Sequence, residues 1–119
     1  MNSKRKGAEG EREAAEFIRD VWGLPCRRGQ QYRGSIDSPD VVSGFDGVHI
    51  EVKRVERLDL CAAMRQATED AGGMLPLVLH RRNKSEWLVT FPANRVEEFV
   101  RLWDEAQRKH HTGGDPNVN

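Results

Sequence analysis

The segment from residue 38 to residue 53 constrains the fold of this chain more than any other. Two short stretches, residues 38–42 and 48–53, are rich in β-branched residues. The residues between them, 43–47, include Gly and Asp, which favour turns. We therefore expect two adjacent strands joined by a turn. Because side chains alternate along a strand, the second strand should present one apolar face and one polar face. The apolar face consists of Val48, Ile50 and Val52, and the polar face of His49, Glu51 and Lys53.

The polar face of the second strand has the composition of a cation site. Glu51 and Lys53 lie side by side on it, and Asp40 begins the first strand, from which it can reach the same patch. Two carboxylates suit a hard divalent cation such as Mg²⁺, and a lysine beside them can act on a water molecule. The alternative is that these residues belong to two ordinary polar strand faces.

The composition limits the classes of protein that remain. A chain of 119 residues fits one domain. Its 19 basic and 19 acidic residues give no net charge, so a nucleic acid could bind only to a local basic surface. No apolar run approaches the length of a membrane span, and the basic N-terminus is not typical of a signal peptide. Cys26 and Cys61 form no zinc or CxxC pattern, so we expect reduced thiols in a cytoplasmic protein.

The hydrophobic pattern predicts the element order α-β-β-β-α-β-β-α, which forms a mixed central β-sheet flanked by helices. This single α/β domain should span residues 1–108, followed by a disordered tail at 109–119 that contains His110 and His111. The expected helices cover residues 6–22, 59–71 and a segment that starts at Pro92; besides the two strands described above, the expected strands cover residues 24–28, 74–80 and 86–90.

The first helix has one acidic residue in an unexpected position. At about 100° per residue, Glu9, Glu13, Glu16 and Asp20 share a solvated face, whereas Glu11 falls within the apolar arc. An isolated ionised carboxylate there would be costly, so Glu11 either points at a cation shared with the acids of the two strands or escapes to water near the first turn.

Basic side chains gather near the N-terminus and around the segment that follows the first short strand. Gly34 and Ser35 would let backbone amides approach a phosphate, although an ordinary exposed loop is an equal alternative. Gln66 flanks the buried stripe of the second helix, from which it could support an active site or remain a surface side chain. The candidate phosphate-binding residues are Lys6, Arg12, Arg27, Arg28, Arg33 and Ser35. A second basic cluster consists of Arg81, Arg82 and Lys84, and the sequence does not place it relative to the first.

The order of these motifs resembles the PD-(D/E)XK nucleases, whose restriction-endonuclease-like fold has the same sequence of elements. Pro39-Asp40 followed by Glu51-Val52-Lys53 is similar to the family signature. Arg5-Lys6-Gly7-Ala8 before Glu11-Arg12-Glu13 resembles the start of archaeal-type Holliday-junction resolvases. Gln66-Ala67 and the His-Arg-Arg turn at 80–82, before the Trp-Leu-Val-Thr strand at 87–90, look like small phage-borne resolvases. The loop at 29–38 is longer than in the compact archaeal enzymes.

This resemblance implies a metal-dependent endodeoxyribonuclease that resolves Holliday junctions or other branched DNA and leaves 5′-phosphate ends. In it, Asp40, Glu51 and the Val52 carbonyl hold Mg²⁺, for which Mn²⁺ can substitute. Glu11 completes the site directly or through water, and Lys53 acts on the attacking water. Symmetric cutting of two strands implies a homodimer with two active sites.

Three alternatives remain open at this point. The chain could be a restriction-type, nicking or single-strand-specific nuclease with the same catalytic residues. It could also be a non-catalytic DNA-binding module, although Asp40, Glu51 and Lys53 are all intact. An RNA-binding protein fits less well, because no aromatic strand motif of the RRM kind is present.

Overall fold

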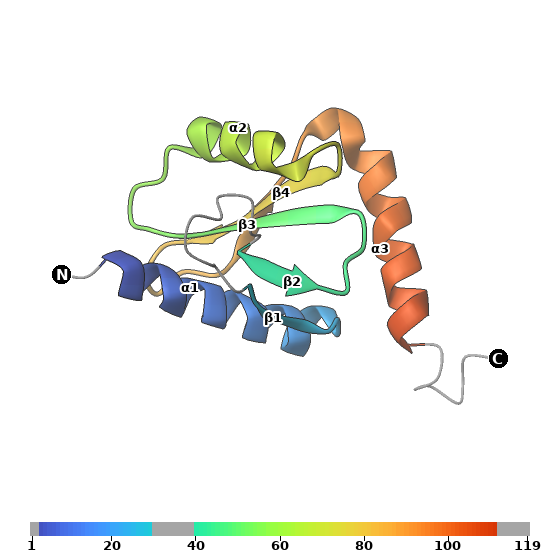
Figure 1. Ribbon diagram of the computed structural model, residues 1–119, viewed down its shortest axis with the longest axis horizontal. Helices are drawn as coiled ribbons and strands as arrows, with labels where there is room; N and C mark the ends of the chain where they lie inside the picture. The colour runs from blue at the N-terminus through green and yellow to red at the C-terminus, as the bar shows by residue number, and fades with distance from the viewer. Residues whose placement is uncertain (1–2, 30–39, 112–119) are drawn as a thin grey trace.

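The computed structural model describes residues 3–29 and 40–111, with side chains from Gly7 onward (Figure 1). The chain forms an α/β domain whose order of helices and strands is the predicted one. The elements are α1 (Ser3–Phe17), continued by the π-helical turn η1 (Ile18–Trp22), β1 (Cys26–Arg28), β2 (Val41–Ser43), β3 (Val48–Arg54), α2 (Leu60–Ala71), β4 (Leu75–Arg81), β5 (Leu88–Thr90), the 3₁₀ turn η2 (Ala93–Arg95) and α3 (Val96–His111).

The described strands form two sheets, a mixed three-stranded sheet in the order β3-β4-β5 and a two-stranded sheet of β1 and β2. β3 pairs in parallel with β4, from Val48 opposite Leu75 to Arg54 opposite Arg81. β4 pairs antiparallel with β5, and β1 pairs antiparallel with β2. The crossover from β3 to β4 passes through α2, as parallel pairing requires. As a result, β3 and β4 end on the same side of the domain.

The predicted pairing of the two adjacent strands, β2 and β3, is wrong, because in the described part of the chain β2 pairs only with β1. Two features of the connection explain this. Phe45 turns into the core, where it is 1% exposed. The Val52 N–H, which a paired strand would bind, instead donates to the side chain of Asp40 at 2.7 Å. Asp40 thus joins the two segments through its carboxylate.

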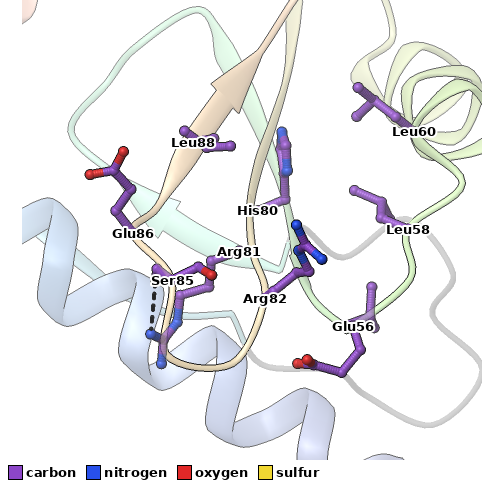
Figure 2. Close-up of a pocket in the computed structure, with 10 residues that line it drawn as sticks. Glu56, Leu58, Leu60, His80, Arg81, Arg82, Ser85, Glu86 and Leu88 are labelled. Atoms are coloured by element: carbon purple, nitrogen blue, oxygen red, sulfur yellow. Dashed lines mark hydrogen bonds between the residues drawn. The ribbon is translucent and has the colours of Figure 1, made fainter.

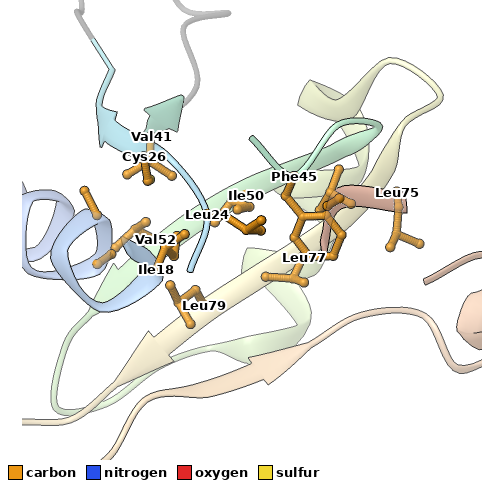
Figure 3. Packing of buried hydrophobic residues seen from close by; sticks show 14 residues of the cluster. Ile18, Leu24, Cys26, Val41, Phe45, Ile50, Val52, Leu75, Leu77 and Leu79 are labelled. Carbon is orange, nitrogen blue, oxygen red and sulfur yellow. The ribbon is translucent and has the colours of Figure 1, made fainter. Parts of the chain in front are cut away.

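Helices cover both faces of the β3–β4 pair, with α1 and α2 on opposite sides (Figure 1). On the α2 side, Ala63 and Ala67 pack on Val78. The main core lies on the other side and is built from aliphatic residues of α1, β3 and β4 with Phe45 at one end (Figure 3). Because Glu51 stands opposite Val78 in the parallel register, the polar face of β3 lies under α2 rather than in open solvent.

Local sequence explains where α2 begins and where α2 and η1 end. Asp59 caps α2, since its side chain accepts a hydrogen bond from the Ala62 N–H at 3.0 Å. Gly72 then takes a left-handed conformation with φ 57°, which glycine adopts without steric cost. Gly23 ends η1 in the same way, with φ 68° and its N–H bonded to the Ile18 carbonyl.

The predicted boundary of the C-terminal tail is wrong, because α3 continues to His111. Its last turns are anchored by long-range contacts that the sequence does not reveal. Gln107 donates to the Trp22 carbonyl at 2.8 Å, and Lys109 pairs with Asp46 at 2.9 Å. The His111 ring lies 3.0 Å from the Gly23 carbonyl. The rest of the expected tail, residues 112–119, lies outside the described residues.

None of the described helices is both long enough and apolar enough to cross a membrane. Cys26 is buried and Cys61 is exposed, and both thiols are free.

Candidate functional site

A cavity of about 300 Å³ lies at the carboxyl end of β3, between that strand, the segment before β2 and the N-terminal half of α1. Glu11, Asp40, Glu51 and Lys53, the predicted catalytic residues, all lie along its wall. Glu11 comes from α1, Asp40 from the segment before β2, and Glu51 and Lys53 from β3, so the fold brings three separate segments together. The full lining is Gly7, Gly10, Glu11, Asp40, Glu51, Val52, Lys53, Arg54 and Val55.

Asp40 is the most strongly perturbed acid of this cavity. Burial and the negative charges of Glu51 and Glu11 together raise the pKa of its carboxyl from 3.8 to about 7. The hydrogen bond from the Val52 N–H and the charge of Lys53 act in the opposite direction but do not prevail. The side chains around Asp40 therefore compensate its negative charge only poorly. A cation bound in the cavity would supply the missing positive charge.

Glu51 occupies a central position between two basic groups. Its Oε2 lies 4.0 Å from Lys53 Nζ, and its Oε1 lies 3.6 Å from His49 Nε2. The Glu51 side chain is only 11% exposed, whereas that of Lys53 is 37% exposed. The lysine can thus reach a molecule that enters the cavity while the carboxylate stays fixed behind it.

Glu11 lies in the middle of α1 and points into the fold, so the alternative of an exposed first-turn acid is wrong. Its side chain is 13% exposed, and its Oε1 accepts a hydrogen bond from Arg28 Nε at 2.9 Å. The charge of Arg28 compensates that of Glu11 at the rim of the cavity. Glu11 therefore contributes to the site through a partner that the sequence placed among the phosphate-binding residues.

Glu13 does not share the solvated face to which the helical projection assigned it. Its Oε1 lies 3.0 Å from Arg54 Nε and 2.7 Å from Arg81 Nη2, so it ties α1 to the ends of β3 and β4. A Cβ on Gly10 would lie 3.1 Å from the Arg54 Cβ, so Gly10 lets α1 approach β3 this closely. The projection missed this contact because it describes a helix without its neighbours.

His49 was expected on the polar face of β3 without a role of its own, and Asp70 was not expected near it. Within residues 3–29 and 40–111, one group of His, Cys, Asp and Glu side chains has all its ligand atoms within 4.8 Å of one another: His49, Glu51 and Asp70. Asp70 comes from the last turn of α2, and Gln66 Nε2 donates to both of its carboxylate oxygens at 3.1 and 3.0 Å. Gln66 thus reaches the neighbourhood of Glu51 through Asp70.

The predicted phosphate-binding residues separate in the structure. Arg28 lies beside Glu11, whereas Arg27 lines a different cavity with Arg19 and Lys109. Arg12 is exposed on α1. Arg33, Ser35 and the side chain of Lys6 lie outside the described part of the chain.

The second basic cluster lies at the same end of the domain as the candidate site. Parallel pairing sets Lys53 beside His80 and Arg54 beside Arg81, and the turn with Arg82 follows directly. A second cavity of about 630 Å³ opens there, between that turn and the segment that leads into α2. In Figure 2, Leu58 and Leu60 face His80 across this cavity, while Arg81 turns away toward α1.

Comparisons with protein-family models, with curated proteins and with solved structures each found no match for this chain. The chemistry and geometry of the site residues are therefore the basis for a function.

Proposed function

We propose that this protein is a Mg²⁺-dependent endodeoxyribonuclease of the PD-(D/E)XK type that cuts branched DNA. One observation carries the proposal: Asp40, Glu51 and Lys53 line a single cavity at the end of β3, where burial and the neighbouring carboxylates raise the pKa of Asp40. At Asp40, burial and the neighbouring acids outweigh the compensating charge of Lys53, and such a perturbed carboxyl in a cavity is typical of a functional site.

The donor set of the cavity fits a hard divalent cation. Asp40 and Glu51 offer carboxylate oxygens, which Mg²⁺ prefers. The N–H and C=O of one strand residue point to the same edge of the strand. Since the Val52 N–H binds Asp40, the Val52 carbonyl faces that edge as well and can serve as a third ligand. Bound there, Mg²⁺ would stabilise the charge that develops on a phosphodiester and lower the pKa of a bound water.

The remaining groups of the cavity divide the other tasks. Lys53, which is more exposed than Glu51, would orient the attacking water and stabilise negative charge on the phosphate oxygens. Glu11 and its partner Arg28 form the rim, where the guanidinium can exchange its carboxylate partner for a DNA phosphate. This pairing explains how a chain without net charge can keep a basic group beside an acidic site.

Branched DNA is the substrate that the resemblance to resolvases favours, and the placement of basic side chains supports it. Arg28 lies beside Glu11 at the site, and exposed Arg82 and Lys84 follow β4 at the same end. Two separated basic surfaces suit a DNA that presents more than one arm. Symmetric cleavage of a four-way junction further implies a homodimer.

A cleavage assay in Mg²⁺ that compares a four-way junction, a fork, a linear duplex and a single strand tests the proposal. We expect the junction to be cut fastest, with 5′-phosphate products. Preference for a linear duplex or a single strand would indicate another nuclease of this type. Junction binding without cleavage in Mg²⁺ or Mn²⁺ would indicate a non-catalytic module.

The role of Glu11 has a matched control on the same helix. Glu11→Gln keeps the shape of the side chain but removes its charge, and we expect slower cleavage with an unchanged melting temperature. Glu16→Gln changes an exposed acid of α1 and should leave both quantities unchanged. Equal cleavage by the two variants would remove Glu11 from the site.

A further inference from the structure

The polar face of β3 carries a second cluster of ligand atoms, on the side of Glu51 that faces away from Lys53. His49 precedes Glu51 by two residues and shares its face, and Asp70 reaches them from the last turn of α2. The ligand atoms of these three residues lie within 4.8 Å of one another. Three side chains from two elements thus converge on one point beneath α2.

His49 has an unmet bonding requirement at this point. The residue is 5% exposed, and its Nε2 has no hydrogen-bond partner among the described residues. Its neighbour Glu51 Oε1 lies 3.6 Å away, which is too far for a hydrogen bond. A buried ring nitrogen without a partner costs free energy, unless something absent from the protein chain satisfies it.

The separation between these two atoms fits two ligands of one ion. Metal–nitrogen and metal–oxygen bonds of about 2.1 Å at a tetrahedral angle place the two ligand atoms roughly 3.4 Å apart. The observed 3.6 Å is close to that value. One imidazole with two carboxylates is a donor set suited to zinc and related transition metals rather than to Mg²⁺.

The cluster also has an approach from solvent. His49 and Asp70 line a cavity of about 280 Å³ that Asp46 and Met74 border on the outside. This cavity shares neither Asp40 nor Lys53 with the one at the end of β3. An ion could therefore enter from the side of the β2–β3 connection without passing the candidate active site.

We infer that His49, Glu51 and Asp70 form a binding site for a divalent transition-metal ion, with Zn²⁺ the best fit, next to the cavity that holds Asp40. Gln66 is a positioning residue of this site, because its amide binds both oxygens of Asp70 and thereby fixes the direction of that carboxylate. The site shares Glu51 with the cavity that holds Asp40 but uses neither Asp40 nor Lys53, so metal binding there can be measured without nuclease activity.

Calorimetric titration of the EDTA-stripped protein with Zn²⁺, in excess Mg²⁺, tests the inference. We expect one equivalent to bind in the wild type and in Asp40→Asn. His49→Gln and Asp70→Asn should each lower the affinity by at least about a hundredfold, and Gln66→Ala by about tenfold. A double change of His110 and His111 to Ala, which lie on α3 and do not belong to the cluster, should retain the equivalent. Melting curves without metal verify that each variant folds.

A second measurement keeps the test decisive if His49→Gln fails to fold. In NMR spectra of the wild type with ¹⁵N-labelled histidine, Zn²⁺ should shift the Nε2 signal of one buried imidazole. The inference is overturned if the wild type binds no Zn²⁺, if Asp70→Asn binds it as tightly as the wild type, or if no buried imidazole signal moves. Those results would leave His49 and Glu51 as neighbouring side chains that hold no metal ion.

Discussion

The two ends of β3 are surrounded by different kinds of side chain. At the N-terminal end, Phe45 packs against the rings of Trp22, Phe99 and Trp103, with centroids 5.6 to 6.0 Å apart. At the carboxyl end, the side chains that meet are carboxylates and a lysine around a cavity. Aromatic packing of this kind stabilises a fold, whereas poorly compensated buried charge destabilises it. We conclude that one end of the strand holds the domain together and the other end is available for chemistry.

The largest effect should come from the carboxyl end. Asp40→Asn and Lys53→Ala should each lower the rate of DNA cleavage on the order of a thousandfold, because each removes a group that acts on the metal, the water or the phosphate. Junction binding in Ca²⁺ should persist, since affinity comes mainly from basic side chains. Asp46→Asn, which changes an exposed acid near the opposite end, should cut at the wild-type rate. Wild-type cleavage by either site variant would remove that residue from the mechanism.

The opposite result is expected at the aromatic end. Phe45→Ala should lower the free energy of unfolding by about 3 to 5 kcal/mol, because it leaves a cavity among three aromatic rings. The surviving folded protein should keep the cleavage rate of the wild type per active molecule. Chemical denaturation measures the first quantity, and active-site titration with the cleavage assay measures the second. A small loss of stability with a large loss of rate would contradict the division between the two ends.

The charge at the carboxyl end also predicts a dependence of stability on pH. The folded protein raises the pKa of Asp40 from 3.8 to about 7, so in this range the folded state binds more protons than the unfolded state. In EDTA, the contribution of Asp40 to stability should therefore be fully present below about pH 4 and be lost as the pH rises through 7.

Two comparisons sharpen this expectation. Asp40→Asn should have a flatter pH profile of melting temperature and should be more stable than the wild type at pH 8 in EDTA. Mg²⁺ should raise the melting temperature of the wild type at pH 8 and should have little effect on the variant, because the cation compensates the charge of Asp40. Parallel pH profiles of the two proteins would show that the folded state does not raise the pKa of Asp40.

The order of the elements follows from patterns within short segments, and so does the unusual position of Glu11 on its helix. Periodicity, turn residues and caps act over a few positions, so the sequence could predict them. The grouping of Glu11 with Asp40 and Glu51 joins distant segments, and it was expected from the resemblance to a known family. The missed features all depend on which distant segments touch. Nothing local to Asp70 indicates that the end of α2 lies over His49, and nothing local to Glu13 indicates its contacts with Arg54 and Arg81. The same reason explains why α3 extends past the expected end of the domain.

The smallest expected effect concerns Arg27 and Arg28, which the sequence predicted as equal candidates for phosphate binding. Arg28 is paired with Glu11 at the rim of the site, whereas Arg27 lines a cavity with Arg19 and Lys109 on another side of β1. If DNA binds over the site, Arg28→Gln should weaken junction binding in Ca²⁺ and reduce the slope of log affinity against log salt by about 0.9, the value for one lost phosphate contact. Arg27→Gln removes the same charge and should leave the slope unchanged, so total charge cannot account for a difference. A larger effect of Arg27→Gln would move the DNA to the surface formed by β1 and the end of α3, and would separate DNA binding from the cavity that holds Asp40.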